Sequence, residues 1–187
     1  MSNGQSTWEA GSFIDGPEIS KDPNLPTGGE ASYTGIATGN YAAILGTEFE
    51  IIGEETDISG WYDGDFTATA NFSNGGGTLS GEIIVTESTE YLSYRDTLRK
   101  HTNFVKDSEI SWSGIEFDSD GQASGDVTVT IPGLGREASG GKTGNKFSSE
   151  NTGGNPRLIA GTHGGSFEST GGTEVGFIGV HIGAINQ

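Results

Sequence analysis

Short stretches of alternating apolar and polar residues, separated by glycine-rich turns, run through most of this chain. Alternation with a period of two is typical of β-strands that have one face against a core. The clearest hairpin is predicted over residues 60–85, where the apolar residues of 66–72 share one face and Asn74-Gly75 lies in the turn. A second hairpin is predicted over residues 110–131, with its turn at 118–121.

Further strands are predicted outside these hairpins, at residues 33–41, 47–53, 158–161, 165–168 and 175–182. In the last of them, glycines separate apolar β-formers at short intervals, so these strands must bend sharply and pack closely. Strands of this kind close a small barrel. Residues 135–156 are so polar and rich in glycine that we expect a mobile loop there, with one short strand around 146–148.

Composition supports an all-β fold in a single domain. The 187 residues suffice for one domain with a core, and the 33 glycines disfavour helices, whose interiors each glycine destabilises by about 1 kcal/mol. Prolines and glycines break regular structure in residues 1–30, where we expect an extended N-terminal arm or linker before a barrel at 31–187. Large apolar residues in that segment favour an arm laid over the barrel; they are Trp8, Phe13, Ile14 and Ile19.

The formal net charge is -17, from 26 acidic and 9 basic residues. The resulting negative field repels phosphate, so we expect neither nucleic acid nor an anionic membrane surface as a partner. It can attract cations or a basic host protein, and it also keeps a protein soluble. Cysteine is absent, which excludes disulfides, thiolate metal sites and a cysteine nucleophile. No stretch approaches the roughly 20 apolar residues of a membrane-spanning helix, and residues 1–8 lack the features of a signal peptide.

Several motifs follow one another in an order that resembles a known family. They are Tyr33-x-Gly35, the strand at 65–72 with its turn and the return strand at 79–83, Gly165-Ser166-Phe167, and Glu174-Val175-Gly176-Phe177. In this order and spacing, residues 31–187 resemble the barrel domain of transferrin-binding protein B, which recurs in factor H-binding lipoproteins and in the haem-capturing hemophilins of Gram-negative bacteria. The resemblance implies an eight-stranded antiparallel barrel with a filled interior and functional loops at one end.

Residues 86–108 interrupt the strand pattern and form the insert in which we look for function. Ser88 can cap a short helix on which Tyr91, Tyr94 and Leu98 share one face, with His101 continuing it; a loop is the alternative. Four of the nine basic residues lie in this insert, namely Arg95, Arg99, Lys100 and Lys106. This concentration in an acidic chain indicates contact with an anionic group, either on a ligand or on the barrel itself.

Haem is the ligand that the resemblance suggests for this insert. Its candidate binding residues are His101, Tyr94, Tyr91, Arg95, Arg99 and Lys100. The imidazole would ligate the iron as the metal ligand, the phenol rings and Phe104 would line the porphyrin, and the basic groups would pair with the propionates. In the alternative interpretation, the aromatic stripe packs the insert onto the barrel and leaves His101 in solvent.

The remaining histidines are expected to face solvent. His163 lies in a Gly-rich segment that predicts a flexible turn, and no second histidine is near it in the sequence to complete a metal site. His181 alternates with Val180 and Ile182, which places its side chain on the opposite face of the strand, the solvent face of a barrel wall.

Two acidic patterns indicate calcium binding or glycoside hydrolysis. Residues 118–121 have the carboxylates and the glycine of a calcium loop but lack the downstream bidentate glutamate, so a hairpin turn is the better interpretation. Carboxylate pairs suited to a glycosidase are Glu54-Glu55 with Asp57, and Asp63 with Asp65. A chain with 26 acids yields such pairs by chance, so we expect no enzyme.

The sequence therefore predicts a non-enzymatic binding protein, secreted or exposed at the bacterial cell surface. Loops held by a rigid barrel would capture haem or an iron-carrying host protein, and no other cofactor is expected. We expect a monomer without membrane insertion. The alternative is a structural or adhesive surface protein that binds no small molecule.

Overall fold

The structure is a computed structural model, and it describes residues 23–45, 56–94, 97–102, 105–132, 137–152, 154–168 and 172–186. Its main strands are β1 (Gly28–Leu45), β2 (Thr56–Ser73), β3 (Gly76–Tyr94), β5 (Glu109–Phe117), β6 (Gln122–Thr130), β7 (Glu137–Phe147), β10 (Leu158–Glu168) and β11 (Glu174–Ile185). Three short strands accompany them, namely β4 (Thr97–Thr102), β8 (Asn151–Thr152) and β9 (Asn155–Pro156). No helix in the described part of the chain is long and apolar enough to cross a membrane.

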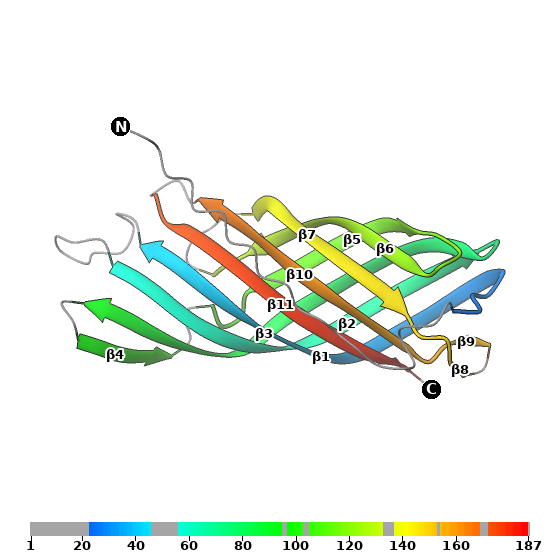
Figure 1. Cartoon of the computed structure of the whole chain (residues 1–187), viewed down its shortest axis with the longest axis horizontal. Coiled ribbons are helices and arrows are strands. Elements are labelled where there is room, and N and C mark those ends of the chain that lie inside the picture. Colours follow the sequence, from blue (N-terminus) through cyan, green and yellow to red (C-terminus); the bar gives the residue numbers. More distant parts are fainter. Residues whose placement is uncertain are drawn as a thin grey trace.

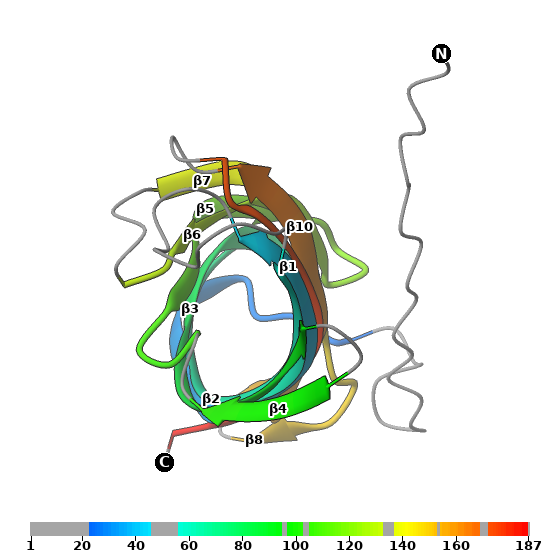
Figure 2. The same cartoon turned by 90° about the vertical axis from the view of Figure 1, so that its left-hand side faces the viewer.

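The eight main strands form a closed antiparallel barrel, which confirms the predicted fold class (Figures 1 and 2). Each main strand pairs with the next one along the chain, and pairing of β1 with β11 closes the ring. Neighbours in sequence are therefore neighbours in space, and no connection crosses the sheet. Closure removes the free strand edges that an open sheet would expose.

The two ends of the barrel differ because the strands differ in length. Strands β1, β2 and β3 have 18, 18 and 19 residues, whereas β5 and β6 have 9 each. The long strands reach past the others at one end, here called the distal end, where β4 pairs with the last residues of β3 (Figure 1). The ladder between β7 and β10 stops at Lys142 and Gly164, although β10 continues toward this end beside β11.

The expected helix in the insert is wrong, because its residues form a β-hairpin. Strand β3 continues to Tyr94 without a break, and its last residues pair with β2 on one side and with β4 on the other. A helix this short has little stability by itself, whereas the long β2 offers the insert a ready ladder of backbone hydrogen bonds.

The expected loop at residues 135–156 is also wrong over much of its length, because β7 occupies Glu137–Phe147. Over residues 141–147, where the burial of this strand is described, the buried positions are Gly141, Thr143, Asn145 and Phe147. Only Phe147 among them is strongly apolar, so the period-two signal is missing. Pairing with β6 and β10 satisfies the backbone, and the polar side chains find partners inside the barrel.

The two predicted hairpins are confirmed as β2–β3 and β5–β6. Asn74 and Gly75 both have positive φ, 52° and 79°, as a two-residue turn between twisted strands requires. At the second turn, the Asp118 carboxylate accepts hydrogen bonds from the backbone N–H groups of Asp120 and Gln122. The predicted strand at residues 47–53 lies outside the described residues.

Residues 23–27, the described part of the expected arm, lie across the end of the barrel opposite the distal end. Pro23 is buried, and Leu25 packs against the core. The Asn24 carbonyl accepts a hydrogen bond of 3.0 Å from the Asn151 side chain, and the Thr27 carbonyl accepts one from the Asn74 backbone. These bonds tie the described part of the arm to two turns at this end of the barrel, here called the arm end. Residues 1–22 lie outside the described part.

Candidate functional site

His163 and His181 lie inside the barrel, so the prediction that both face solvent is wrong. Each side chain is only 1% exposed. His163 belongs to strand β10 rather than to a turn, and His181 shares the inward face of β11 with Gly179 and Gly183. The apolar neighbours Val180 and Ile182 face outward instead, which reverses the assignment that hydrophobicity alone favours.

A chain of hydrogen bonds crosses the lumen through these two rings. The Tyr62 hydroxyl lies 2.6 Å from His163 Nε2, and His163 Nδ1 lies 3.1 Å from His181 Nδ1. His181 Nε2 in turn lies 2.7 Å from Asn145 Oδ1. Strands β2, β10, β11 and β7 each contribute one of these residues, so the chain joins opposite sides of the barrel.

The position of each proton along this series of hydrogen bonds follows from the end at Thr143 and Asn145. The Thr143 hydroxyl donates to the Thr162 carbonyl, so it accepts from Asn145 Nδ2, which fixes the amide orientation. Asn145 Oδ1 can only accept, so His181 carries its proton on Nε2 and presents a bare Nδ1. His163 must then donate from Nδ1, and its Nε2 accepts the Tyr62 hydroxyl proton.

Burial keeps all of these groups neutral. It lowers the pKa of His163 to about 4, and it lowers the pKa of His181 to about 3 together with the neighbouring His163 charge. Burial raises the pKa of Tyr62 above its ordinary range. Both nitrogens of each ring are engaged in the chain, so neither ring is available to ligate haem iron. Within the described residues, no group of three or more His, Asp or Glu side chains is arranged to hold a metal ion.

Glycines in neighbouring strands make room for these large rings. A Cβ atom at Gly161 would lie 2.5 Å from His181 Nε2, and one at Gly179 would lie 2.5 Å from His163 Nε2. A Cβ atom at Gly39 would likewise lie 2.5 Å from the Tyr62 ring. The glycine pattern, which predicted sharp bends, therefore marks the positions where a ring from the adjacent strand crosses the backbone.

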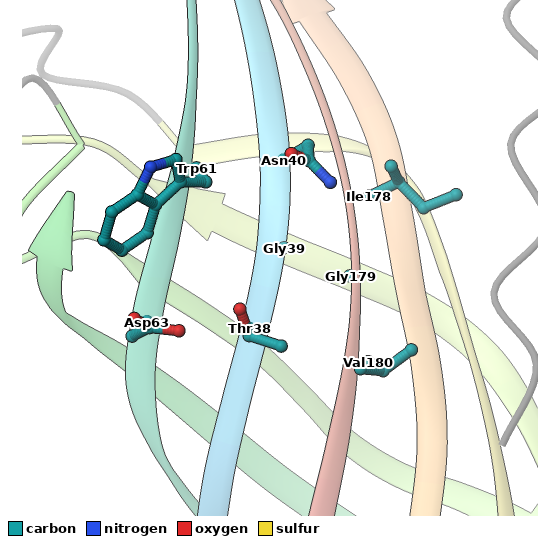
Figure 3. Close-up of a pocket in the computed structure, with 8 residues that line it drawn as sticks. All are labelled: Thr38, Gly39, Asn40, Trp61, Asp63, Ile178, Gly179 and Val180. Carbon is teal, nitrogen blue, oxygen red and sulfur yellow. The ribbon is translucent and has the colours of Figure 1, made fainter. Parts of the chain in front are cut away.

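The outer side of the same wall carries a groove, here called the outer-wall groove. Its floor is the cross-strand pair of Gly39 in β1 and Gly179 in β11. It is an open depression of about 370 Å³ lined by Thr38, Gly39, Asn40, Trp61, Asp63, Ile178, Gly179 and Val180 (Figure 3). Figure 3 shows Trp61 and Asp63 on the β2 side of the groove.

Apolar side chains of β2 and β11 flank this groove on the solvent side of the barrel, and the polar Thr38 and Asn40 of β1 lie between them. Trp61 is 40% exposed, and Ile36 and Ile182, which are cross-strand partners, are 66% and 38% exposed. On β11, Val180 lies between Ile182 and the groove floor, and Ile178 lies on the other side of Gly179; both are half-buried. An exposed tryptophan near exposed aliphatic side chains is characteristic of interaction sites on soluble proteins.

Carboxylates line the β2 edge of the groove. Asp63 lies beside Trp61 on the outward face of β2, Asp65 follows on the same face, and Glu87 of β3 is the cross-strand partner of Asp63. All three are exposed, and none forms an ion pair with another described residue. The Asp63–Asp65 pair therefore adds negative charge to this face of the barrel.

The residues predicted to bind haem lie in the β3–β4 hairpin or beside it. The register pairs Tyr91 with Lys100, Tyr94 with Thr97, and Glu90 with His101. Tyr91 and Tyr94 belong to the continuous strand β3, so the helical stripe expected for them is absent. Only the backbone of this hairpin is described, so its role as a haem site stays a prediction. The remaining candidates of the insert and of the acidic pairs, Arg95, Phe104, Glu54 and Glu55, lie outside the described residues.

The groove and the hairpin adjoin each other on the barrel wall. Trp61 pairs with Thr89 of β3, and Thr89 pairs with Thr102 of β4, so one row leads from the groove to the base of the hairpin. Sequence reasoning missed the groove because Trp61 looks like any outward residue of a strand. The available signal was the alternation of the strand. Gly60 and Tyr62 are in step with the buried row of residues 66–72, so Trp61 between them must face outward.

The chain matches no protein-family model, and no curated protein matches its sequence. The eight-stranded antiparallel barrel that the family resemblance implies is present.

Proposed function

We propose that this chain is a non-enzymatic binding module of a secreted or cell-surface bacterial protein, and that it captures an iron-carrying host protein on the outside of its barrel. The observation that carries the proposal is the outer-wall groove, where an exposed Trp61 adjoins a projecting hairpin on a barrel whose lumen is filled. Aromatic residues at the centre of an apolar surface contribute most of the binding energy in many protein interfaces. The resemblance to transferrin-binding protein B barrels supports the same role.

The packed lumen favours a ligand on the outer surface. Phe72, Phe117 and Phe147 have ring centroids 5.0 to 5.6 Å apart near the arm end, and the neutral polar chain fills the middle. A ligand inside would have to displace these side chains, whereas the outer wall and the hairpin are available without rearrangement. Rigid presentation of this kind reduces the entropy lost on binding.

Haem is the second candidate ligand, and the basic hairpin is the observation that favours it. The carboxylates beside the groove repel the propionates of haem, whereas Arg99 and Lys100 in β4 have the charge to pair with them. The two candidates therefore use different surfaces, and experiments can separate them.

An absorbance titration with hemin at neutral pH tests the haem candidate. A saturable one-to-one Soret change that His101→Ala weakens and the neighbouring Thr102→Ala does not would assign haem to the hairpin. Absence of a Soret change, or equal effects of the two variants, would remove haem from this site.

A biosensor experiment tests the protein candidate with the immobilised chain and soluble human transferrin and haemoglobin, each with and without iron or haem. We expect at least one of them to bind, and Trp61→Ala to weaken binding while Asp120→Ala, in the β5–β6 turn, leaves it unchanged. If neither these proteins nor hemin binds, the capture proposal fails and the adhesive alternative takes its place.

A further inference from the structure

We propose that the outer-wall groove binds an arginine or lysine side chain of a partner protein, flanked in that protein by aliphatic residues. The inference rests on the proposed binding function and adds the chemistry of the contact. It assigns the cation to the β2 side of the groove and the aliphatic residues to the β1–β11 side.

The β2 side offers two groups that attract a cation. The exposed indole of Trp61 can hold an ammonium or guanidinium group over its face, and the carboxylate of Asp63 can accept its hydrogen bonds. Trp61 and Asp63 are two residues apart on one strand, so their Cα atoms lie about 7 Å apart, a span that a guanidinium group can bridge. Glu87 adds a second carboxylate across the strand pair, and no described cation neutralises either one.

The β1–β11 side carries no charge: the polar Thr38 and Asn40 of β1 lie next to β2, and apolar surface lies beyond them. Ile36 and Ile182 are partly exposed cross-strand neighbours, and Ile178 and Val180 continue the same outward row of β11 toward the groove floor. Aliphatic residues that flank the partner's cation would bury this surface. An anionic partner is disfavoured here both by the local carboxylates and by the net charge of -17.

The backbone of the groove leaves no room for a partner to add a strand. At the groove, β1 pairs with β2 and β11, β2 also pairs with β3, and β11 also pairs with β10. Recognition must therefore come from side chains rather than from the backbone ladder. The floor is also held from inside, since Tyr62 and His163 pack against Gly39 and Gly179. The groove is thus preformed for a side chain to enter.

Nuclear magnetic resonance with defined peptides tests this inference. The ¹⁵N-labelled chain is titrated with Ac-Leu-Arg-Leu-NH₂, with Ac-Leu-Gln-Leu-NH₂ as the neutral match and Ac-Leu-Glu-Leu-NH₂ as the anionic one. We expect the arginine peptide to shift the Trp61 indole signal and the amides of residues 38–40 and 178–180 saturably. Its affinity should exceed that of the glutamine peptide about two- to fivefold, the effect of one exposed cation–π contact.

Variants then assign the contact to individual side chains. Trp61→Ala should remove the shifts, and Asp63→Asn should lower the affinity for the arginine peptide while a smaller preference over the glutamine peptide remains, because the contact with Trp61 is kept. Asp120→Asn, a charge change at the β5–β6 turn, should have no effect. Equal shifts with all three peptides, shifts outside the groove, or none at all would overturn the inference. Any of these outcomes would overturn the cation site alone. The proposed function is tested separately, by the experiments with hemin and the host proteins.

Discussion

His163 Nδ1 and His181 Nδ1 lie 3.1 Å apart inside the barrel, so one ring must donate the hydrogen bond that the other accepts. Each ring is therefore held in a different tautomer, and neither can gain a proton without breaking a bond of the chain.

The first prediction concerns the tautomers. Long-range ¹H–¹⁵N correlation of the imidazole rings at pH 7 should show His163 protonated at Nδ1 and His181 protonated at Nε2. The buried Asn145 imposes this difference, and the Tyr62 hydroxyl follows it by donating to His163 Nε2. Finding the same tautomer in both rings, or a charged ring, would contradict the derived direction of the chain.

The second prediction concerns acid stability. Both histidines have folded-state pKa values, about 4 and about 3, below the ordinary value near 6.5, so the unfolded chain binds protons more readily. The free energy of unfolding is therefore highest above pH 6.5 and falls as the pH drops from there toward the folded-state values. Between pH 7.5 and 5.5 the loss should be about 1 kcal/mol for each histidine.

Urea unfolding at several pH values measures this dependence, in a range where most carboxylates stay ionised. The double variant that combines His163→Gln with His181→Gln should have a lower free energy of unfolding at pH 7.5, but this free energy should change less down to pH 5.5. A wild-type midpoint that does not change over this range would show that the histidines are not held neutral by folding.

The third prediction concerns the glycines beneath the rings. Gly179→Ala places a methyl group 2.5 Å from His163 Nε2 and should destabilise the barrel by about 1–3 kcal/mol, the usual cost of overpacking. Gly176→Ala, in the same strand, meets nothing within 4 Å and should cost little or stabilise slightly. Thermal unfolding compares the pair, and equal melting temperatures would argue against the packing described.

The fourth prediction concerns the Tyr62 hydroxyl, which donates to His163 at one end of the hydrogen-bond chain. Tyr62→Phe keeps the ring but leaves His163 Nε2 buried without its donor, which should cost about 1–3 kcal/mol. It should leave His163 protonated at Nδ1, because Asn145 sets the direction of the chain, and it should shift the resonance of the Nε2 atom that has lost its hydrogen bond, which loss of packing alone would not do. Chemical denaturation together with the imidazole spectra distinguishes the two effects; an unchanged His163 spectrum would refute the proposed direction of donation.

Much of the barrel could be predicted from sequence because several strands carry their largest apolar residues on the inward face. Phe66, Ala68, Ala70 and Phe72 of β2 form such a row, and the prediction of the β2–β3 hairpin followed directly. The same logic failed for β7, where Thr143 and Asn145 face inward. Their partners are contributed by β10 and β11, which the local pattern does not contain.

The candidate site was harder to predict, since it depends on which face of β11 points inward. Ile178, Val180 and Ile182 are the hydrophobic residues in the middle of that strand, yet they line the outside, while Gly179, His181 and Gly183 face the lumen. The choice is settled by the fit between glycines and rings on neighbouring strands, a relationship between distant residues. The insert shows the same limit, because its strand conformation is imposed by pairing with β2.

The unequal strand lengths divide the molecule into two parts with different tolerance to sequence change. Toward the arm end, all eight strands enclose packed rings, and the turns are hydrogen-bonded to residues 23–27. Toward the distal end, β7 and β10 no longer pair, and β4 joins the sheet beside β3. Variation among related chains should therefore concentrate at the distal end, where a new binding preference can arise without repacking the interior.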